Sequence, residues 1–449
     1  MATSREMTEG RALPLIFNFT LPLLLGNLLQ QTYSLVDAAI VGRFLGINAL
    51  ASVGASTSVV FLILGFCNGC CGGFGIPVAQ KFGARDYVTM RRYVAVSLQL
   101  AAVMSVVIAV VTSIYCADIL HMMSTPENIF TGAYYYLLVT FIGVPFTFFY
   151  NLLSSIIRAL GDSKTPFWFL LLSTVLNILL DLFCILVLGW GVAGAAIATL
   201  ASRVFCAVVV LWQLRMDRQP IVVRNYRQIR PDGKMIRRVL ALGIPSGIEN
   251  SMFQLGKLAI QSSVSTLGTV AIAAQAMTNI LENLNGIAAI GVGIGLMTVV
   301  GQCLGAGRKD EAVYYIKKLS VLAEIIVVAS CLLVFALTIP VTKLGGMESE
   351  SARMCFHMIS WITVVKPIVW TLAFIPAYGL RAAGDVKFSM LTSCITMWTF
   401  RFCLCVYLIR FRGFGPMAVW IGMFTDWTVR GIVFSLRFHS RKWLKHKVV

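Results

Sequence analysis

Long apolar stretches, each about the length of a membrane-spanning helix, recur along the whole chain. An α-helix rises 1.5 Å per residue, so about 20 apolar residues cross the roughly 30 Å hydrocarbon layer of a bilayer. Short polar segments separate the stretches. The pattern predicts an all-α integral membrane protein of twelve transmembrane helices, at residues 12–41, 47–77, 93–116, 132–157, 165–188, 190–214, 239–266, 268–301, 313–339, 355–380, 388–411 and 414–436.

The composition excludes a soluble protein. Of the 449 residues 58% are hydrophobic and 12% are charged, whereas soluble domains are about 45–50% apolar and about 25% charged. The short loops leave no room for a catalytic domain, and no GxxxxGK[ST] motif indicates ATP use. A membrane enzyme such as an acyl or glycosyl transferase would need clustered catalytic groups. The four histidines form no such cluster, so we expect neither an enzyme nor a cofactor; they are His121, His357, His439 and His446.

The formal net charge of +18 raises the question of nucleic acid binding. The positions of Lys and Arg answer it, because they gather in alternate loops and in the tail. The opposite loops hold only Arg43, Lys343, Arg353, Arg410 and Arg412. This is the positive-inside pattern, which predicts a cell inner (plasma) membrane protein with both termini in the cytoplasm. The basic segments are then expected to face anionic membrane lipids and not nucleic acid.

The two halves of the chain resemble each other at an offset of about 222 residues. LGINALASVGAS, from Leu45, aligns with LGTVAIAAQAMT, from Leu267, and RALGDSKTP, from Arg158, aligns with RAAGDVKFS, from Arg381. This predicts two six-helix lobes related by a parallel internal repeat. The expected parts are a lobe at 1–215, a basic cytoplasmic linker at 216–235, a lobe at 236–438 and a basic tail at 439–449. In secondary transporters this arrangement puts the substrate near the bilayer midplane between the repeats, with alternating access.

Several motifs carry a more specific resemblance. LQQTYSLVDAAIVGRFLG, VAQKFGA, VGQCLGAG and RALGDSKTP resemble the multidrug and toxic compound extrusion (MATE) family, and most closely its bacterial branch named for DNA-damage-inducible protein F. The resemblance implies a V-shaped pair of lobes that exports cationic or amphiphilic organic compounds in exchange for protons or sodium ions. We expect small organic substrates and a monomer. The alternative within the superfamily is a flippase for a lipid-linked saccharide or precursor.

Ionisable residues inside predicted spans point to the coupling chemistry, because a charge at mid-membrane costs about 2.5–3.5 kcal/mol even on insertion scales. Counting the helical rise from the predicted outer ends puts Asp37, Asp181 and Thr199 at similar depth. Asn177 is one turn before Asp181, on the same helix face. Such oxygen ligands suit a sodium ion, and two close carboxylates equally suit a proton. The resemblance implies the same four residues as the cation-coupling site. Simple hydrogen bonding of the aspartates across helices is the alternative.

Further polar residues are candidates for the substrate cavity. Tyr33 and Gln30 continue the stripe of Asp37 by successive helical turns, and the resemblance implies that Asn151 faces it. In the second half Gln275, Asn279 and Glu282 share one helix face. The preceding span adds Glu249, which is either a substrate-facing acid or a protonated one. The complete set is Gln30, Tyr33, Asn151, Glu249, Gln275, Asn279 and Glu282.

Helical rise also suggests an ion pair in the second half. Lys257 lies at a depth from which it can pair with Glu282 or Asp426, and we predict these three as a structural ion-pair group. No partner is predicted for Arg203, Lys366 or Arg401.

Small residues inside the spans invite two other interpretations. The glycine runs Gly65 to Gly75 and Gly286 to Gly295 have small-xxx-small spacing, which favours close helix packing over phosphate binding. Cys67, Cys70 and Cys71 lack the further ligands of a zinc site and are expected to be packing residues.

Overall fold

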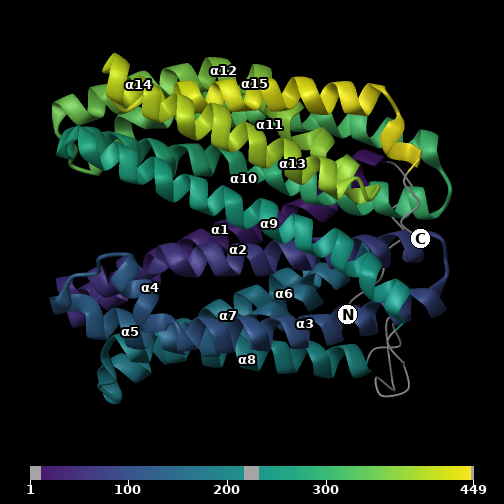
Figure 1. The fold of residues 1–449 in the computed structure, drawn as a ribbon, viewed down its shortest axis with the longest axis horizontal. Helices are drawn as coiled ribbons and strands as arrows, with labels where there is room; N and C mark the ends of the chain where they lie inside the picture. The colour runs from purple at the N-terminus through teal and green to yellow at the C-terminus, as the bar shows by residue number, and fades with distance from the viewer. Residues whose placement is uncertain (1–11, 217–231, 446–449) are drawn as a thin grey trace. The chain divides into compact units, whose positions relative to one another are not determined.

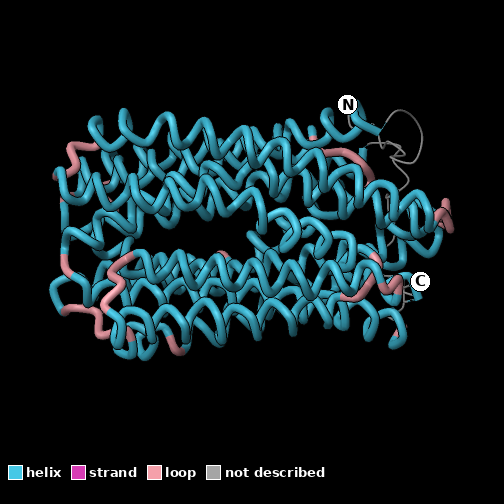
Figure 2. Tube along the Cα trace, turned by 90° about the horizontal axis from the view of Figure 1, so that it is seen from above, coloured by secondary structure: helices cyan, strands magenta, loops and turns pink. Residues whose placement is uncertain are grey.

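The computed structural model describes residues 12–216 and 232–445, and these residues are helical with short connections (Figures 1 and 2). The predicted linker lies almost entirely outside the described residues. In chain order the elements are α1 (Ala12–Leu45), α2 (Ile47–Gly83), α3 (Tyr87–Ile114), α4 (Cys116–Met122), α5 (Glu127–Ile142), α6 (Val144–Ala159), α7 (Lys164–Leu182), η1 (Phe183–Val187), α8 (Gly191–Met216), α9 (Gly233–Val264), η3 (Ser265–Leu267), α10 (Thr269–Gly305), α11 (Lys309–Leu344), α12 (Ser349–Ala382), α13 (Val386–Thr396), η4 (Met397–Cys403), α14 (Leu404–Arg412), α15 (Met417–His439) and η5 (Lys442–Lys445).

Each predicted span coincides with a helix or with a group of consecutive helices. Among the described residues, eight helices are long and apolar enough to cross a membrane by themselves. The pair α5 and α6, which is bent by 48°, makes a ninth if it forms one span. The remaining long helices are α1, α9 and α15, and the last two carry charged residues in their middle turns, such as Lys257 and Asp426.

The described chain divides into two compact units. Unit 1 comprises residues 21–216 and 232–251, and unit 2 comprises residues 12–20 and 252–445. Within unit 1, α2 packs against α6 and α7 packs against α8; within unit 2, α10, α11 and α12 pack together and α12 packs against α15. The units differ from the predicted lobes at two helices. The beginning of α1 belongs to unit 2 and the beginning of α9 belongs to unit 1, with Pro22 just after the division in α1.

Glycines allow α2 and α9 to approach closely within unit 1. A Cβ atom added at Gly73 would lie 2.5 Å from the carbonyl oxygen of Leu242 and 2.6 Å from the Cα of Gly243. Gly69 similarly meets the backbone of Ser246. The close-packing interpretation of this glycine run therefore holds for these two residues. Small residues at helix contacts are the usual means of such an approach in membranes.

This contact makes a prediction with a matched control on the same helix. Gly73→Ala is expected to destabilise the protein by about 1–3 kcal/mol, because backbone atoms cannot move away as a flexible side chain can. Gly72 has no atom within 4 Å of the position of an added Cβ, so Gly72→Ala should not lower stability. Thermal unfolding of the two variants in detergent measures the difference. Equal melting temperatures for Gly73→Ala and the wild type would contradict the packing argument.

Aspartates at the helix starts organise the connections. Asp162 accepts hydrogen bonds from the backbone N–H groups of Lys164 and Thr165 at 3.0 and 3.1 Å, at the start of α7. Asp86 accepts from the backbone of Thr89 at 3.2 Å, and the hydrogen bonds from Thr89 lower the pKa of Asp86. Asp385, the repeat counterpart of Asp162, pairs with Arg437 at 2.7 Å. These acids therefore serve local structure.

Candidate functional site

A buried polar cluster lies inside unit 1, where α1, α7 and α8 contribute side chains. Asp181 on α7 is fully buried and Asp37 on α1 is partly buried. Their carboxyl groups lie within hydrogen-bonding reach of each other. Ionised carboxylates only accept hydrogen bonds, so a direct bond between the two would need a proton on one of them. The pair therefore has the chemistry to hold one exchangeable cation.

Asn177 and Thr199 connect this pair to Tyr33. The Asn177 amide nitrogen donates to Asp181 Oδ2 at 3.0 Å, and its oxygen accepts from the hydroxyl and the backbone N–H of Thr199 at 3.2 and 3.1 Å. The Tyr33 hydroxyl lies 3.2 Å from Thr199 Oγ1. Because the Thr199 hydroxyl donates its proton to Asn177, Tyr33 is the donor in this second hydrogen bond. The structure thus brings together four residues predicted as the coupling site and one predicted for the cavity. The network fixes the Asp181 carboxyl from one side.

The surroundings of the cluster are apolar. Buried Ile40, Val41 and Ile185 belong to a hydrophobic cluster against which Ile178 and Leu182 of α7 pack. Asp37 Oδ1 and Asp181 Oδ1 are buried and have no hydrogen-bond partner in the described parts of the chain. Unsatisfied carboxyl oxygens in such a medium are costly. They therefore fit a proton or an oxygen-coordinated sodium ion as the species that satisfies them.

A π-helical turn, η1, begins two residues after Asp181. Such turns frequently occur at functional sites, because the extra residue re-aims the neighbouring side chains. The second half has a π-helical turn in the corresponding span, η4, which contains Arg401.

Two further residues lie near the cluster, although the sequence did not assign them to it. Tyr136 of α5 lies close enough to Asp37, Asp181 and Tyr33 to sense their charges. Arg203 lies one turn after Thr199 on α8, acts electrostatically on Tyr33, and places its guanidinium 5.2 Å from the ring centre of Tyr150. The run Tyr134 to Tyr136 in an apolar span gives no sign of which ring faces inward. Arg203, four residues after Thr199, could have been assigned from the helical period.

The other cavity candidates do not form one group within a unit. Gln30, Asn151 and Glu249 belong to unit 1. Glu249 is buried, while Gln30 and Asn151 are partly exposed. Within the described chain, neither the Gln30 nor the Asn151 side chain bonds to the carboxyl cluster.

In unit 2 the predicted polar face of α10 is largely engaged in contacts within the unit itself. Gln275 is buried, donates to Asn279 Oδ1 at 3.2 Å and accepts from the indole N–H of Trp420 at 3.1 Å. Both ends of its amide are thus occupied. Glu282 lies further along the same face.

The predicted ion pairing of Lys257 was wrong. Lys366 Nζ lies 2.7 Å from Glu282 Oε1, and Arg430 bonds both oxygens of Asp426 at 2.9 and 3.0 Å. Lys257 is exposed and places its Nζ 5.7 Å from the ring centre of Phe253, although its charge still acts on Glu282. The helical rise predicts how deep a residue lies in the membrane, but it does not predict which helices are neighbours. The packing of α12 against α10 selects Lys366, and the i,i+4 spacing on α15 selects Arg430.

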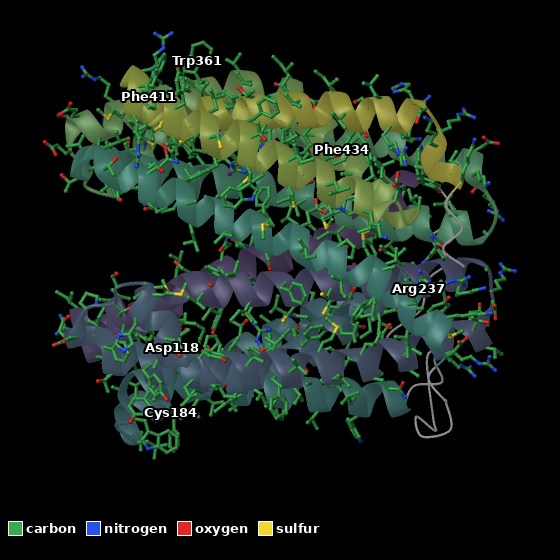
Figure 3. The ribbon with its side chains drawn as sticks, viewed as in Figure 1. Asp118, Cys184, Arg237, Trp361, Phe411 and Phe434 are labelled. Carbon is green, nitrogen blue, oxygen red and sulfur yellow. The ribbon has the colours of Figure 1, made fainter. Side chains whose placement is uncertain are left out.

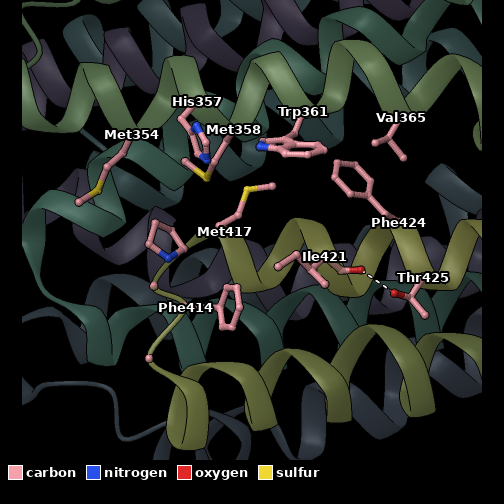
Figure 4. A pocket seen from close by; sticks show the side chains of 13 residues that line it. Met354, His357, Met358, Trp361, Val365, Phe414, Met417, Ile421, Phe424 and Thr425 are labelled. Carbon is pink, nitrogen blue, oxygen red and sulfur yellow. Dashed lines mark hydrogen bonds between the residues drawn. The ribbon is translucent and has the colours of Figure 1, made fainter.

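An apolar pocket of about 730 Å³ lies elsewhere in unit 2, between α12, α15 and the loop at 413–416 (Figure 4). Methionine and aromatic side chains dominate its wall. They include Met354, Met358, Met417, Trp361, Phe414 and Phe424. His357 is the one ionisable residue of the lining. The pocket contains no residue of the predicted sites and lacks the oxygen ligands of an ion site.

Comparisons with known proteins agree with the resemblance. The sequence profile of the MatE family matches residues 22–183 and again 245–407. The probable multidrug resistance protein YoeA of Bacillus subtilis (strain 168) is 30% identical over 438 residues, which cover 94% of each chain. A crystal structure of MATE in the straight conformation superposes with a TM-score of 0.87 at 23% identity, over 97% of each chain.

A structure of a multidrug resistance MATE family transporter in an outward-facing conformation superposes with a TM-score of 0.85 at 22% identity, over 96% of each chain. The predicted all-α membrane fold is thereby confirmed. The chain belongs to the MATE family and is a multi-pass membrane transporter, not an enzyme.

Proposed function

We propose that this transporter exports cationic or amphiphilic organic compounds in exchange for protons or sodium ions. The observation that supports the exchange is the contact between the Asp37 and Asp181 carboxyl groups in an apolar part of unit 1. The sequence motifs further favour the branch named for DNA-damage-inducible protein F. YoeA, a relative of similar length, is described as a probable multidrug resistance protein.

In the proposed cycle the coupling cation neutralises the carboxyl pair and so allows α1 and α7 to pack closely. When the cation leaves, two carboxylates in a low dielectric repel each other, which favours a different packing of the same helices. The cation gradient then biases an equilibrium between two lobe states, as alternating access requires. Asn177 and Thr199 keep the Asp181 carboxyl in place through this change.

The proposed orientation has both termini in the cytoplasm. Arg237 lies at the opposite end of unit 1 from Asp118 (Figure 3). Arg237 and Arg238 precede the seventh predicted span, and the predicted inner segment after the second span carries Lys81, Arg91 and Arg92. The positive-inside rule assigns that end to the cytoplasm.

Purified protein in vesicles provides the test. The fluorescent cation ethidium and an anionic dye are followed while a proton or a sodium gradient is imposed separately. We expect one of the gradients to drive accumulation of at least one dye against its concentration. Movement of neither dye beyond equilibrium under either gradient would contradict the proposed exchange.

A further inference from the structure

Three cationic side chains surround one aromatic ring in unit 2. The ring centre of Phe253 lies 5.0 Å from the Arg401 guanidinium, 5.8 Å from that of Arg430 and 5.7 Å from Lys257 Nζ. The residues come from α9, η4 and α15. A ring face attracts a neighbouring cation, but it does not remove the repulsion among three of them.

The nearby acids form their direct ion pairs with other cations, although the charges of Asp426 and Glu282 also act on Arg401. Asp426 forms an ion pair with the Arg430 guanidinium, and Glu282 forms one with Lys366. In the described parts of the chain, Arg401 and Lys257 form no ion pair, and Glu324 of α11 pairs with neither. Arg401 is 5% exposed, and its Nε and Nη1 have no hydrogen-bond partner there. A permanently charged guanidinium therefore lies buried with two unsatisfied donors.

Such a group is costly unless something satisfies it. A guanidinium offers planar donors that match a carboxylate, sulfonate or phosphate. The exposed Lys257 beside the same ring supplies a second positive charge at the surface of unit 2. Phe253 supplies an apolar face next to these donors. Arg430, which shares that ring, also lies 5.3 Å from the ring centre of Phe374. The π-helical turn that carries Arg401 is a backbone irregularity of the kind found at binding sites.

We propose that Arg401 and Lys257 bind the oxyanion of an amphiphilic substrate whose aromatic body packs on Phe253. The proposal rests on the proposed export function and refines its substrate class to include organic anions. The expectation of cationic solutes came from the acids of the first half. Asp37 and Asp181 bind the coupling cation in the proposed cycle, so they do not decide the charge of the substrate.

The test compares two probes that differ only in charge, dansyl-phenylalanine and its neutral carboxamide. Their equilibrium binding to purified protein in detergent is measured by fluorescence, without any gradient. The anion should bind about tenfold or more tightly than the amide, as charge-assisted hydrogen bonds predict. Arg401→Gln should remove this preference, and Lys257→Met should reduce it. Arg410→Gln, an exposed arginine on α14, is the matched control and should retain it.

Arg401→Lys and Lys257→Met decide the question if Arg401→Gln fails to fold. Lysine keeps the positive charge but lacks the planar set of N–H donors of a guanidinium. A reduced preference for the anionic probe in both Arg401→Lys and Lys257→Met therefore supports the subsite. Equal binding or no binding of the two probes by wild-type protein would overturn it, as would a preference that neither variant changes. Because binding needs no gradient, intact anion preference with no driven transport would contradict the exchange function and not the subsite.

Discussion

Asp181→Asn is expected to abolish gradient-driven accumulation of substrate while leaving folded protein and substrate binding in place. Moving one charge across 100 mV is worth about 2.3 kcal/mol, which corresponds to roughly a fiftyfold concentration ratio. Asn cannot exchange a proton or neutralise a sodium ion, so the ratio should fall to about one. Asp37→Asn should act in the same way, since the two carboxyl groups lie close together and would share one cation. Uptake into vesicles of defined potential measures the ratio.

Asp118→Asn is the matched control, because Asp118 is an exposed aspartate of α4 in the same unit. It should transport like the wild type. The ion dependence separates the two coupling cations, because a neutralised proton site loses its pH dependence and a neutralised sodium site loses its sodium dependence. Wild-type accumulation by both Asp37→Asn and Asp181→Asn would mean that the cluster is structural only.

Lys366→Met is expected to destabilise the protein by about 3–5 kcal/mol, the usual loss when one partner of a buried ion pair is removed. Lys366 is fully buried, and the side chain of Glu282 is 16% exposed. The variant leaves the Glu282 carboxylate without its 2.7 Å partner. The double variant Glu282→Gln, Lys366→Met should recover much of the loss, because neither charge then remains. Unfolding in detergent by heat or denaturant gives the comparison.

Lys257→Met provides the control for this pair. Lys257 is exposed and makes no ion pair with a described residue, so its replacement should change stability little. If Lys257→Met were as destabilising as Lys366→Met, or if the double variant lost the sum of the two single losses, the assigned pairing would be contradicted.

The proximity of the residues in the proposed coupling cluster was predictable from the sequence because they share a depth and a helical period. Asp37, Asp181 and Thr199 lie at similar distances from their helix ends, and Asn177 is one turn from Asp181. Depth alone was enough here because α7 and α8 are consecutive helices that pack together. The orientation of the Asn177 amide and the proximity of Tyr136 depend on side-chain packing, which the period does not encode.

The ion pairs of unit 2 could not be predicted in the same way. Lys257, Lys366 and Arg401 are all cations inside spans, and depth cannot choose among them as partners of Glu282. That choice depends on which helices are neighbours. The pair of Arg430 with Asp426 was not predicted, although its i,i+4 spacing is visible in the sequence. In the described parts of the chain this pairing leaves Arg401 and Lys257 without an ion-pair partner, and the proposed anion subsite rests on that observation.

The central claim is that the Asp37 and Asp181 pair binds the cation that is exchanged for substrate. Its most direct test measures, in one vesicle preparation, the proton and sodium flux that added substrate evokes without any imposed gradient. The account predicts that wild-type protein moves one of these cations against the substrate and that Asp181→Asn moves neither. An equal cation flux from wild type and Asp181→Asn, evoked by the same substrate, would contradict the account.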